Sequence, residues 1–207
     1  MTPRRGGPSG TAPPPPAWLA TSALPLETIP AGQVLYRVHW SSLDPVFFGP
    51  GAGRRPVFRF DSASGLFGVL YAGVQPDGAI AETLLRNPQR RMVSARDVFM
   101  RALSELKPSR ALRMVALHGQ GLQRVGTDNA ISTGPYEPCG AWADSLWLHP
   151  DRPDGIAYAS RHDPGQRCLA IFERADLAFD VAATRSFSAD PGAVAAVLDR
   201  YGKSLDP

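Results

Sequence analysis

The stretch FGVLYAGVQPDGAIAETLLR, from Phe67 to Arg86, contains the change of pattern that decides the fold. Its first half is rich in β-branched and aromatic residues and ends in a tyrosine and a glycine, which predicts a strand over 66–73. The Pro-Asp-Gly turn after it predicts a helix over 78–87, with Asp77 as its N-cap. One carboxylate, Glu82, lies in this helix among alanine, isoleucine and leucine, so the helix carries an acid close to its apolar side.

Short strands and a few helices are predicted along the rest of the chain. Strands are expected at 34–40, 57–60, 111–119, 154–161 and 167–173, and helices at 94–106, 139–147 and 190–201. The connections between the first strands are too short for helical crossovers, so these strands are expected to pair antiparallel. The mixture of elements predicts an α+β fold. Residues 1–30 are rich in Pro, Gly, Ser and Ala, which indicates a flexible tail ahead of one domain at 31–207.

Composition narrows the classes of function. The chain has 207 residues, 43% of them apolar and 20% charged, as expected of a globular protein with a core. The net charge of +3 comes from scattered arginines rather than a stripe, so direct nucleic-acid binding is not expected. Two cysteines without metal spacing indicate reduced thiols in a cytoplasmic protein and no metal site. We expect neither a membrane helix nor a signal peptide, because no long apolar run occurs and prolines interrupt the N-terminus.

Several polar side chains interrupt or end the predicted elements. The candidates for a shared cleft are Arg37, Arg59, Tyr71, Glu82 and Ser160. Each has an ordinary alternative: a strand arginine often faces solvent, a strand tyrosine usually packs in the core, and a carboxylate near a helix N-terminus is mildly stabilising. No GxSxG surrounds Ser160, which argues against serine hydrolysis, and no HExxH or Cys/His cluster points to a metal enzyme.

Arginines combined with one carboxylate and an aromatic side chain suit a different reaction. Arginines bind a diphosphate, an aromatic ring stacks on a flat base, and the carboxylate places a negative charge beside a cationic sugar. Cleavage of the bond between ribose and a positively charged nicotinamide releases a neutral leaving group, so no general acid is needed. The oxocarbenium-like transition state is stabilised by a fixed anion.

Several segments in the same order resemble a known family. They are LYRV (35–38), RFDSASGLFGVLYAG (59–73), AIAET (79–83), DGIAYASRHDP (154–164) and CLAIF (168–172). Together they resemble the RES domain, named for an arginine, a glutamate and a serine, whose members include NAD⁺-consuming toxins of bacterial toxin–antitoxin pairs. The resemblance spans about two-thirds of the chain. It departs from the family at Phe58-Arg59-Phe60, where many members have Gly-Arg-Trp.

The resemblance implies an ADP-ribosyltransferase-like fold, with small, twisted, mostly antiparallel sheets around a cleft and flanking helices. It implies that NAD⁺ is a substrate rather than a cofactor, cleaved by hydrolysis or phosphorolysis. ADP-ribosyl transfer to a protein, or a non-catalytic NAD⁺- or ADP-ribose-binding module, are the alternatives. It also implies an antitoxin with a helix-turn-helix DNA-binding part as a separate protein, whereas the sequence leaves a homo-oligomer open.

The resemblance also assigns roles to individual residues. Arg59 and Arg37 would hold the NAD⁺ phosphates, Glu82 would stabilise the ribosyl cation, and Tyr71 would pack against the nicotinamide or its ribose. Ser160 would bond the carboxamide or ribose. The remaining candidates, at the rim or as substrate-binding residues, are Tyr36, His39, Arg161 and His162.

Overall fold

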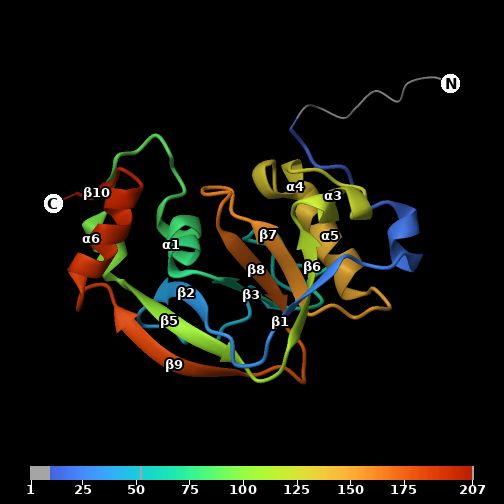
Figure 1. Ribbon diagram of the computed structural model, residues 1–207, viewed down its shortest axis with the longest axis horizontal. Helices are drawn as coiled ribbons and strands as arrows, with labels where there is room; N and C mark the ends of the chain where they lie inside the picture. Colours follow the sequence, from blue (N-terminus) through green and yellow to red (C-terminus); the bar gives the residue numbers. More distant parts are fainter. Residues whose placement is uncertain (1–9, 52, 207) are drawn as a thin grey trace.

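The computed structural model describes residues 10–51 and 53–206, and Figure 1 shows their arrangement. An eight-stranded sheet has the order β1-β6-β7-β8-β3-β2-β5-β9, and β10 pairs with β4 beside it. The strands are β1 (Leu26–Ile29), β2 (Leu35–Trp40), β3 (Val69–Gly73), β4 (Met92–Val93), β5 (Arg101–Pro108), β6 (Leu112–Leu117), β7 (Gly155–Ala159), β8 (Arg167–Phe172), β9 (Phe179–Ser186) and β10 (Ser204–Leu205). The helices are η1 (Ala17–Thr21), α1 (Pro76–Leu84), α2 (Ala95–Phe99), α3 (Gln120–Val125), α4 (Ala130–Thr133), α5 (Glu137–Trp147) and α6 (Pro191–Arg200).

The large sheet divides into two halves that meet at β2 and β3. Neighbouring strands are antiparallel throughout, except that β6 and β7 run parallel. The β2–β5 pair extends along all of β2, whereas β2 and β3 share the single register pair Tyr36↔Gly73. In Figure 1, α3, α4 and α5 lie over the β6–β8 half, and α6 lies beside the β2–β5 half. The expected α+β fold with mostly antiparallel strands is confirmed.

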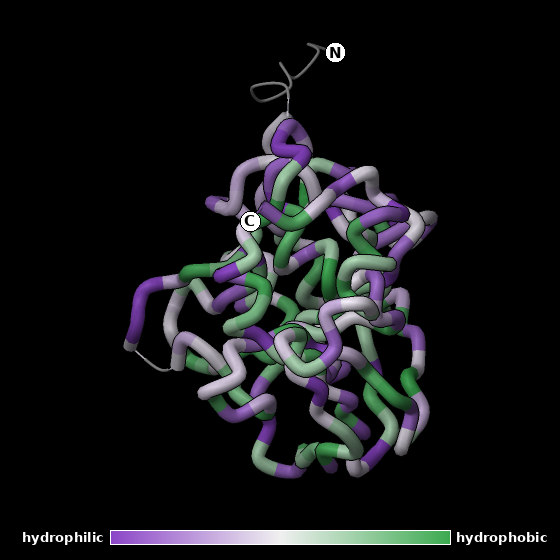
Figure 2. The backbone as a smooth tube through the Cα atoms, turned by 90° about the vertical axis from the view of Figure 1, so that its left-hand side faces the viewer, coloured by the Kyte–Doolittle hydropathy of each residue, from purple (hydrophilic) through white to green (hydrophobic). Residues whose placement is uncertain are grey.

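Apolar side chains from both halves form the core. The largest cluster packs α5 against the sheet around Trp142, Phe60 and Phe172. A second cluster joins α1 and α6 through Ile80 and Val194. In Figure 2 hydrophobic segments run through the interior, and most of the peripheral loops are hydrophilic. A third cluster spans the β2–β3 junction, because it contains Leu35 of β2 together with Leu70 and Ala72 of β3.

The turn from β3 into α1 explains how the helix is fixed. Gly73 has no room for a side chain, because an added Cβ would lie 2.7 Å from the backbone nitrogen of Ala79 and 2.7 Å from the carbonyl oxygen of Gln75. Gln75, rather than the expected Asp77, is the N-cap, and Pro76 begins the helix. Proline at the first helical position starts a helix without losing a hydrogen bond, which moves the start ahead of the expected residue.

Two predicted elements differ in the structure. Residues 57–60 form a turn rather than a strand, because Asp61 Oδ2 accepts hydrogen bonds from the backbone nitrogens of Val57 and Phe58. The predicted helix at 94–106 is instead α2 followed by β5. Ser94 does cap α2, accepting from the nitrogen of Asp97. Burial alternates along β5, and this period of two matches a strand.

The expected flexible tail at 1–30 is wrong for the part that the structure describes, and residues 1–9 lie outside the described residues. The segment from Gly10 onward packs on the domain and contributes η1 and β1. Trp142 Nε1 donates to the carbonyl oxygen of Pro13 at 2.8 Å, and Leu19 is buried. A proline-rich segment has few hydrogen bonds of its own, so partners supplied by the domain hold it in place.

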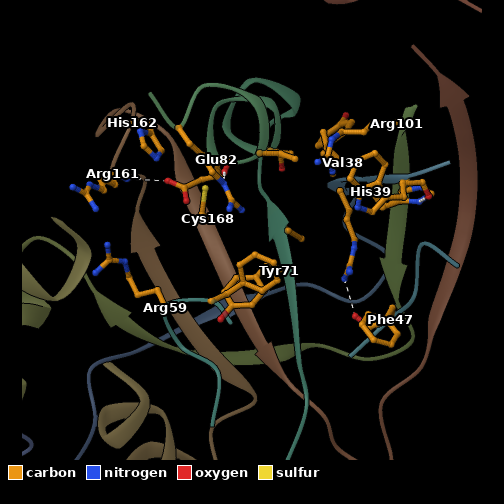
Figure 3. Close-up of a pocket in the computed structure, with 18 of the residues that line it drawn as sticks. Val38, His39, Phe47, Arg59, Tyr71, Glu82, Arg101, Arg161, His162 and Cys168 are labelled. Carbon is orange, nitrogen blue, oxygen red and sulfur yellow. Dashed lines mark hydrogen bonds between the residues drawn. The ribbon is translucent and has the colours of Figure 1, made fainter. Parts of the chain in front are cut away.

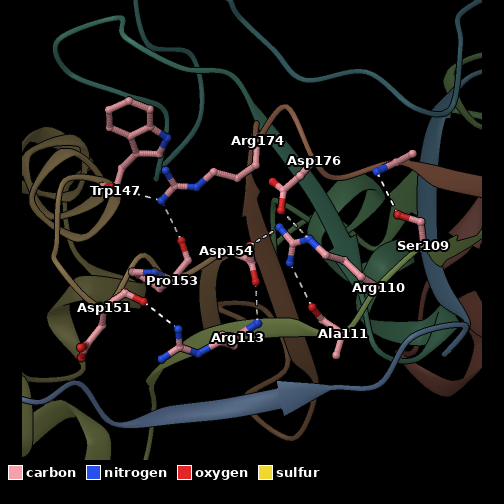
Figure 4. A network of polar contacts seen from close by, with 11 residues as sticks. Ser109, Arg110, Ala111, Arg113, Trp147, Asp151, Pro153, Asp154, Arg174 and Asp176 are labelled. Carbon is pink, nitrogen blue, oxygen red and sulfur yellow. Dashed lines mark hydrogen bonds and ion pairs between the residues drawn. The ribbon is translucent and has the colours of Figure 1, made fainter.

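A polar network ties together the turns at one end of β5, β6 and β7 (Figure 4). Arg110 Nη2 donates to Asp154 Oδ1 at 2.7 Å, and its Nε lies 3.0 Å from Asp176 Oδ2. Asp154 Oδ2 accepts from the backbone nitrogen of Arg113 at 2.8 Å. Arg174 Nη2 donates to two carbonyl oxygens. We call Arg110, Asp154, Arg174 and Asp176 the structural network.

Among the described helices, none is long and apolar enough to cross a membrane.

Candidate active site

A cleft of about 440 Å³ opens at the β2–β3 junction, and Figure 3 shows its lining side chains. Both halves of the sheet contribute: Tyr36, Arg37 and His39 come from β2, Tyr71 from β3 and Glu82 from α1. Its volume is in the range of small-molecule sites, roughly 300–1,000 Å³. The weak pairing of β2 with β3 therefore coincides with a hollow large enough for a ligand.

Glu82 is held by one oxygen of its carboxylate. Oε1 accepts from the Ser160 hydroxyl at 2.6 Å and from the backbone nitrogen of Arg161 at 2.9 Å. No described residue bonds Oε2, and Glu82 lines the cleft. The buried face of α1 is made by its small and aliphatic residues, such as Ile80. The acid on this helix is thus fixed by donors from the turn between β7 and β8.

Ser160 donates a hydrogen bond to this carboxylate and does not line the cleft. It is 2% exposed, and its oxygen also accepts from the backbone nitrogens of His162 at 3.1 Å and Asp163 at 3.2 Å. A hydroxyl has one donor and two acceptor sites, so all three are in use. The structure therefore shows Ser160 in contact with Glu82, and the expected contact with a carboxamide or ribose stays a prediction.

Arg59 presents a buried cation without a carboxylate partner in the described part of the chain. Its Nη1 donates to the carbonyl oxygens of Ile131 at 3.1 Å and Gly134 at 2.9 Å. The ring of Tyr136 lies 4.5 Å from the guanidinium carbon. Nη2 is buried and has no hydrogen-bond partner among described residues, although the side chain lines the cleft. An unpaired buried donor is costly, which favours a site that an anionic ligand completes.

Tyr71 lines the cleft, and its hydroxyl forms hydrogen bonds with the turn that contains Phe60 and Asp61. The hydroxyl donates to Asp61 Oδ1 at 2.9 Å and accepts from the backbone nitrogen of Phe60 at 2.9 Å. Burial, with the neighbouring Asp61 carboxylate, raises the pKa of Tyr71 well above its usual value. The phenol therefore stays neutral and anchors the turn that carries Arg59. Its ring, packed edge-on against Phe58, is left for a ligand.

Three further arginines extend the positive lining. Arg37 Nη1 donates to the carbonyl oxygen of Phe47 at 3.0 Å, and burial lowers its pKa to about 10, which leaves it charged at neutral pH. Arg101 stacks on Trp40 with 4.0 Å between guanidinium carbon and ring centroid. Arg86 Nε donates to the carbonyl oxygen of Glu82 at 3.0 Å.

The charge of the cleft is unbalanced. The lining cations are Arg37, Arg59, Arg86, Arg101 and Arg161, and the lining carboxylates are Asp44 and Glu82. Burial lowers the pKa of His39 and of His162, so both rings are neutral at pH 7. Among the described residues, no group of three or more His, Cys, Asp or Glu side chains could hold a metal ion. The cleft can therefore bind an anion of two or more charges and place one carboxylate beside it.

The structure brings every sequence-predicted candidate to this place, Ser160 through Glu82 and the others as lining residues (Figure 3). Sequence reasoning missed Arg86, Arg101 and Tyr136. Arg86 follows Glu82 by four residues, and that helical spacing could have identified it. Arg101 falls inside the predicted helix that the structure replaces with β5, and nothing in the sequence marks Tyr136.

Comparisons with known proteins identify the family of this chain. The family model described as RES domain matches residues 34–191. A curated relative, "Probable toxin y4kH" of Sinorhizobium fredii, is 31% identical over 103 residues, which are 50% of this chain and 72% of the relative. The fold is similar to that in the crystal structure of the M. tuberculosis MbcT–MbcA toxin–antitoxin complex, with a TM-score of 0.62 at 15% identity over 84% of this chain and 91% of that one. The chain belongs to the RES domain family.

Proposed function

We propose that the protein cleaves NAD⁺ at the nicotinamide–ribose bond and acts as the toxin of a toxin–antitoxin pair. The observation that carries the proposal is the Glu82 carboxylate, fixed by Ser160 through one oxygen, in a cleft whose arginines outnumber its carboxylates. Family membership and a relative named as a probable toxin support the biological role.

The cleft matches the parts of a dinucleotide. A diphosphate needs more than one cation, and guanidinium groups bind phosphate oxygens through parallel donors. Arg59 offers a buried nitrogen without a partner among described residues, and Arg37 lies on the strand at the other side of the junction. The ring of Tyr71 lines the same cleft and offers a flat surface for a nicotinamide or ribose.

The reaction is derived from the position of Glu82. The bond between ribose C1′ and the pyridinium nitrogen breaks, and its electron pair stays on nitrogen, so nicotinamide leaves neutral without a proton. The ribosyl carbon becomes positively charged, and the fixed carboxylate of Glu82 stabilises this charge. Water or phosphate then adds to C1′. Water releases a proton to the solvent in this step and leaves a hydroxyl on C1′, whereas phosphate forms the new bond through one of its own ionised oxygens.

A separate antitoxin is the proposed partner. Four exposed aromatic or aliphatic side chains ring the mouth of the cleft: Trp40, Leu43, Phe47 and Phe58. An apolar rim around a cationic hollow fits a protein segment with apolar anchors and an acidic group. Following the family resemblance, we propose that this antitoxin also carries a helix-turn-helix DNA-binding part.

The direct test is incubation of the purified protein with NAD⁺, with and without phosphate, and separation of the products by mass. Release of one nicotinamide per NAD⁺ consumed is the expected result. ADP-ribose as second product identifies water as acceptor, a phosphorylated ADP-ribose identifies phosphate, and a mass increase on protein identifies transfer. Intact NAD⁺ under all conditions would contradict the proposal, and binding without turnover would favour a non-catalytic module.

A further inference from the structure

The C-terminal end of α6 contacts both elements that hold Glu82. Arg200 Nη2 donates to the two carboxylate oxygens of Asp77 at 2.6 and 2.8 Å, and its Nε donates to Oδ2 at 3.1 Å. Asp77 lies in the first turn of α1, the helix that carries Glu82. Tyr201, the residue after α6, donates its hydroxyl to Asp163 Oδ2 at 2.7 Å.

Asp163 belongs to the β7–β8 turn, which holds the other side of the carboxylate. Its Oδ1 accepts from the backbone nitrogen of Gly165 at 3.0 Å, so the side chain shapes the turn. Its backbone nitrogen donates to Ser160 Oγ at 3.2 Å, and Ser160 donates to Glu82. Contacts therefore run without a break from Tyr201 through Asp163 and Ser160 to the acid.

We propose that Arg200 and Tyr201 form a clamp that sets the position of the Glu82 carboxylate, acting as positioning residues for the reaction; this rests on the function proposed above. One arm fixes α1 and the other fixes the β7–β8 turn, so the two elements keep a constant separation. In Figure 1, α1 lies between α6 and that turn. Neither clamp residue lines the cleft, and both lie beyond residue 191, where the family match ends.

The clamp has a geometric role that differs from holding α6 on the domain. Val194 and Leu198 already bury the apolar face of α6, and this packing accounts for its stability. The Arg200–Asp77 pair is exposed, and exposed ion pairs contribute little to stability. A reacting group displaced by about 1 Å, in contrast, costs on the order of 100-fold in rate. The contacts of the clamp therefore matter for rate more than for folding.

Two conservative variants test this. Tyr201→Phe and Arg200→Gln should each lower kcat for NAD⁺ cleavage by about 3- to 10-fold with KM changed less than about twofold, because binding groups are untouched. Arg200→Lys should recover part of the loss. Hydrogen exchange at the backbone nitrogens of residues 161–163 should become faster in Tyr201→Phe. Arg185→Gln, which removes an exposed pair with Glu105 at 3.8 Å, is the matched control and should leave kcat unchanged.

Wild-type kcat in both variants, or a raised KM at constant kcat, would overturn the clamp. The hydrogen-exchange measurement distinguishes a failure of the clamp proposal from a failure of the proposed NAD⁺ reaction. If the wild-type protein shows no turnover, the NAD⁺ reaction fails as a proposal. Faster exchange at 161–163 in Tyr201→Phe would then still support the clamp, and unchanged exchange would overturn it.

Discussion

The cleft and the structural network both use arginines, with opposite arrangements of charge. In the network, Arg110 lies 2.7 Å from one carboxylate and 3.0 Å from another, and hydrogen bonding to Asp154 raises its pKa. In the cleft, Arg59 is buried among carbonyl oxygens and an aromatic ring without an ion pair to a described residue. Burial lowers the pKa of Arg37 to about 10.

This difference distinguishes arginines that are paired within the fold from arginines that we propose bind a ligand. A buried cation without a counter-ion costs free energy that a paired one recovers in part. The fold accepts that cost at Arg59, which lines the same cleft as Glu82, and avoids it at Arg110. We therefore propose the unbalanced region as the binding site of an anionic substrate.

The largest effect is expected from removing the charge of Glu82. In Glu82→Gln the amide oxygen keeps the acceptor position for Ser160 and Arg161, so the fold is retained. The rate of nicotinamide release should fall by roughly 100- to 1,000-fold, since fixed charges of this kind contribute a few kcal/mol in a transition state. Steady-state kinetics with NAD⁺ measures it. Glu105→Gln, which lies outside the cleft, serves as the matched control; an equal loss there would refute the special role of position 82.

A smaller effect is expected from the residue that orients this acid. Ser160→Ala removes the donor to Glu82 and the acceptor for two backbone nitrogens. We expect kcat to fall by about 10- to 100-fold with KM nearly constant, because Ser160 positions the carboxylate and does not line the cleft. The split between kcat and KM is the informative quantity. A raised KM at constant kcat would place the hydroxyl on the substrate instead.

The smallest effect is expected in the pH dependence of the free energy of unfolding, through His39, which lines the cleft. Burial lowers the pKa of His39, whose ring contacts the Trp40 carbonyl oxygen and the Ser104 hydroxyl, with Arg37 and Asp44 nearby. Below about pH 6.5 the unfolded chain binds this proton more readily than the native protein, so the free energy of unfolding falls as the pH drops. Denaturant unfolding at pH 7 and pH 5 measures the loss. His39→Gln should reduce it; the same slope in that variant would assign it to other groups.

The sequence predicts the local elements near the cleft better than the connections around them. Regular apolar patterns locate β2, α1 and β7, and the helix at Glu82 is indicated by its turn residues. At Arg59 the pattern favours a strand where the structure has a turn, because a side-chain acceptor at Asp61 competes with β-propensity and leaves no mark on the pattern. At β5 the pattern favours a helix for a different reason. Helix α2 is short, and the strand after it forms because of tertiary pairing with β2 and β9.

In the candidate site, too, some features can be predicted from the sequence and others cannot. Glu82, Arg59 and Tyr71 are identified by residue type within recognisable segments, and the cleft unites them. The role of Ser160 as a support for Glu82, and the presence of Tyr136 on Arg59, depend on long-range contacts between segments. Such contacts leave no period or spacing in a single sequence.

The most direct test compares the same substitution in the two regions. NAD⁺ affinity is measured by calorimetry in Glu82→Gln protein, where turnover should be roughly 100- to 1,000-fold slower, and then with Arg59→Lys or Arg110→Lys added. Lysine keeps the charge and loses the paired donors, so we predict an affinity at least about 10-fold weaker for Arg59→Lys and unchanged for Arg110→Lys. Equal affinities in the two double variants, or no NAD⁺ binding to the Glu82→Gln protein itself, would contradict the assignment of the unbalanced arginines to the substrate.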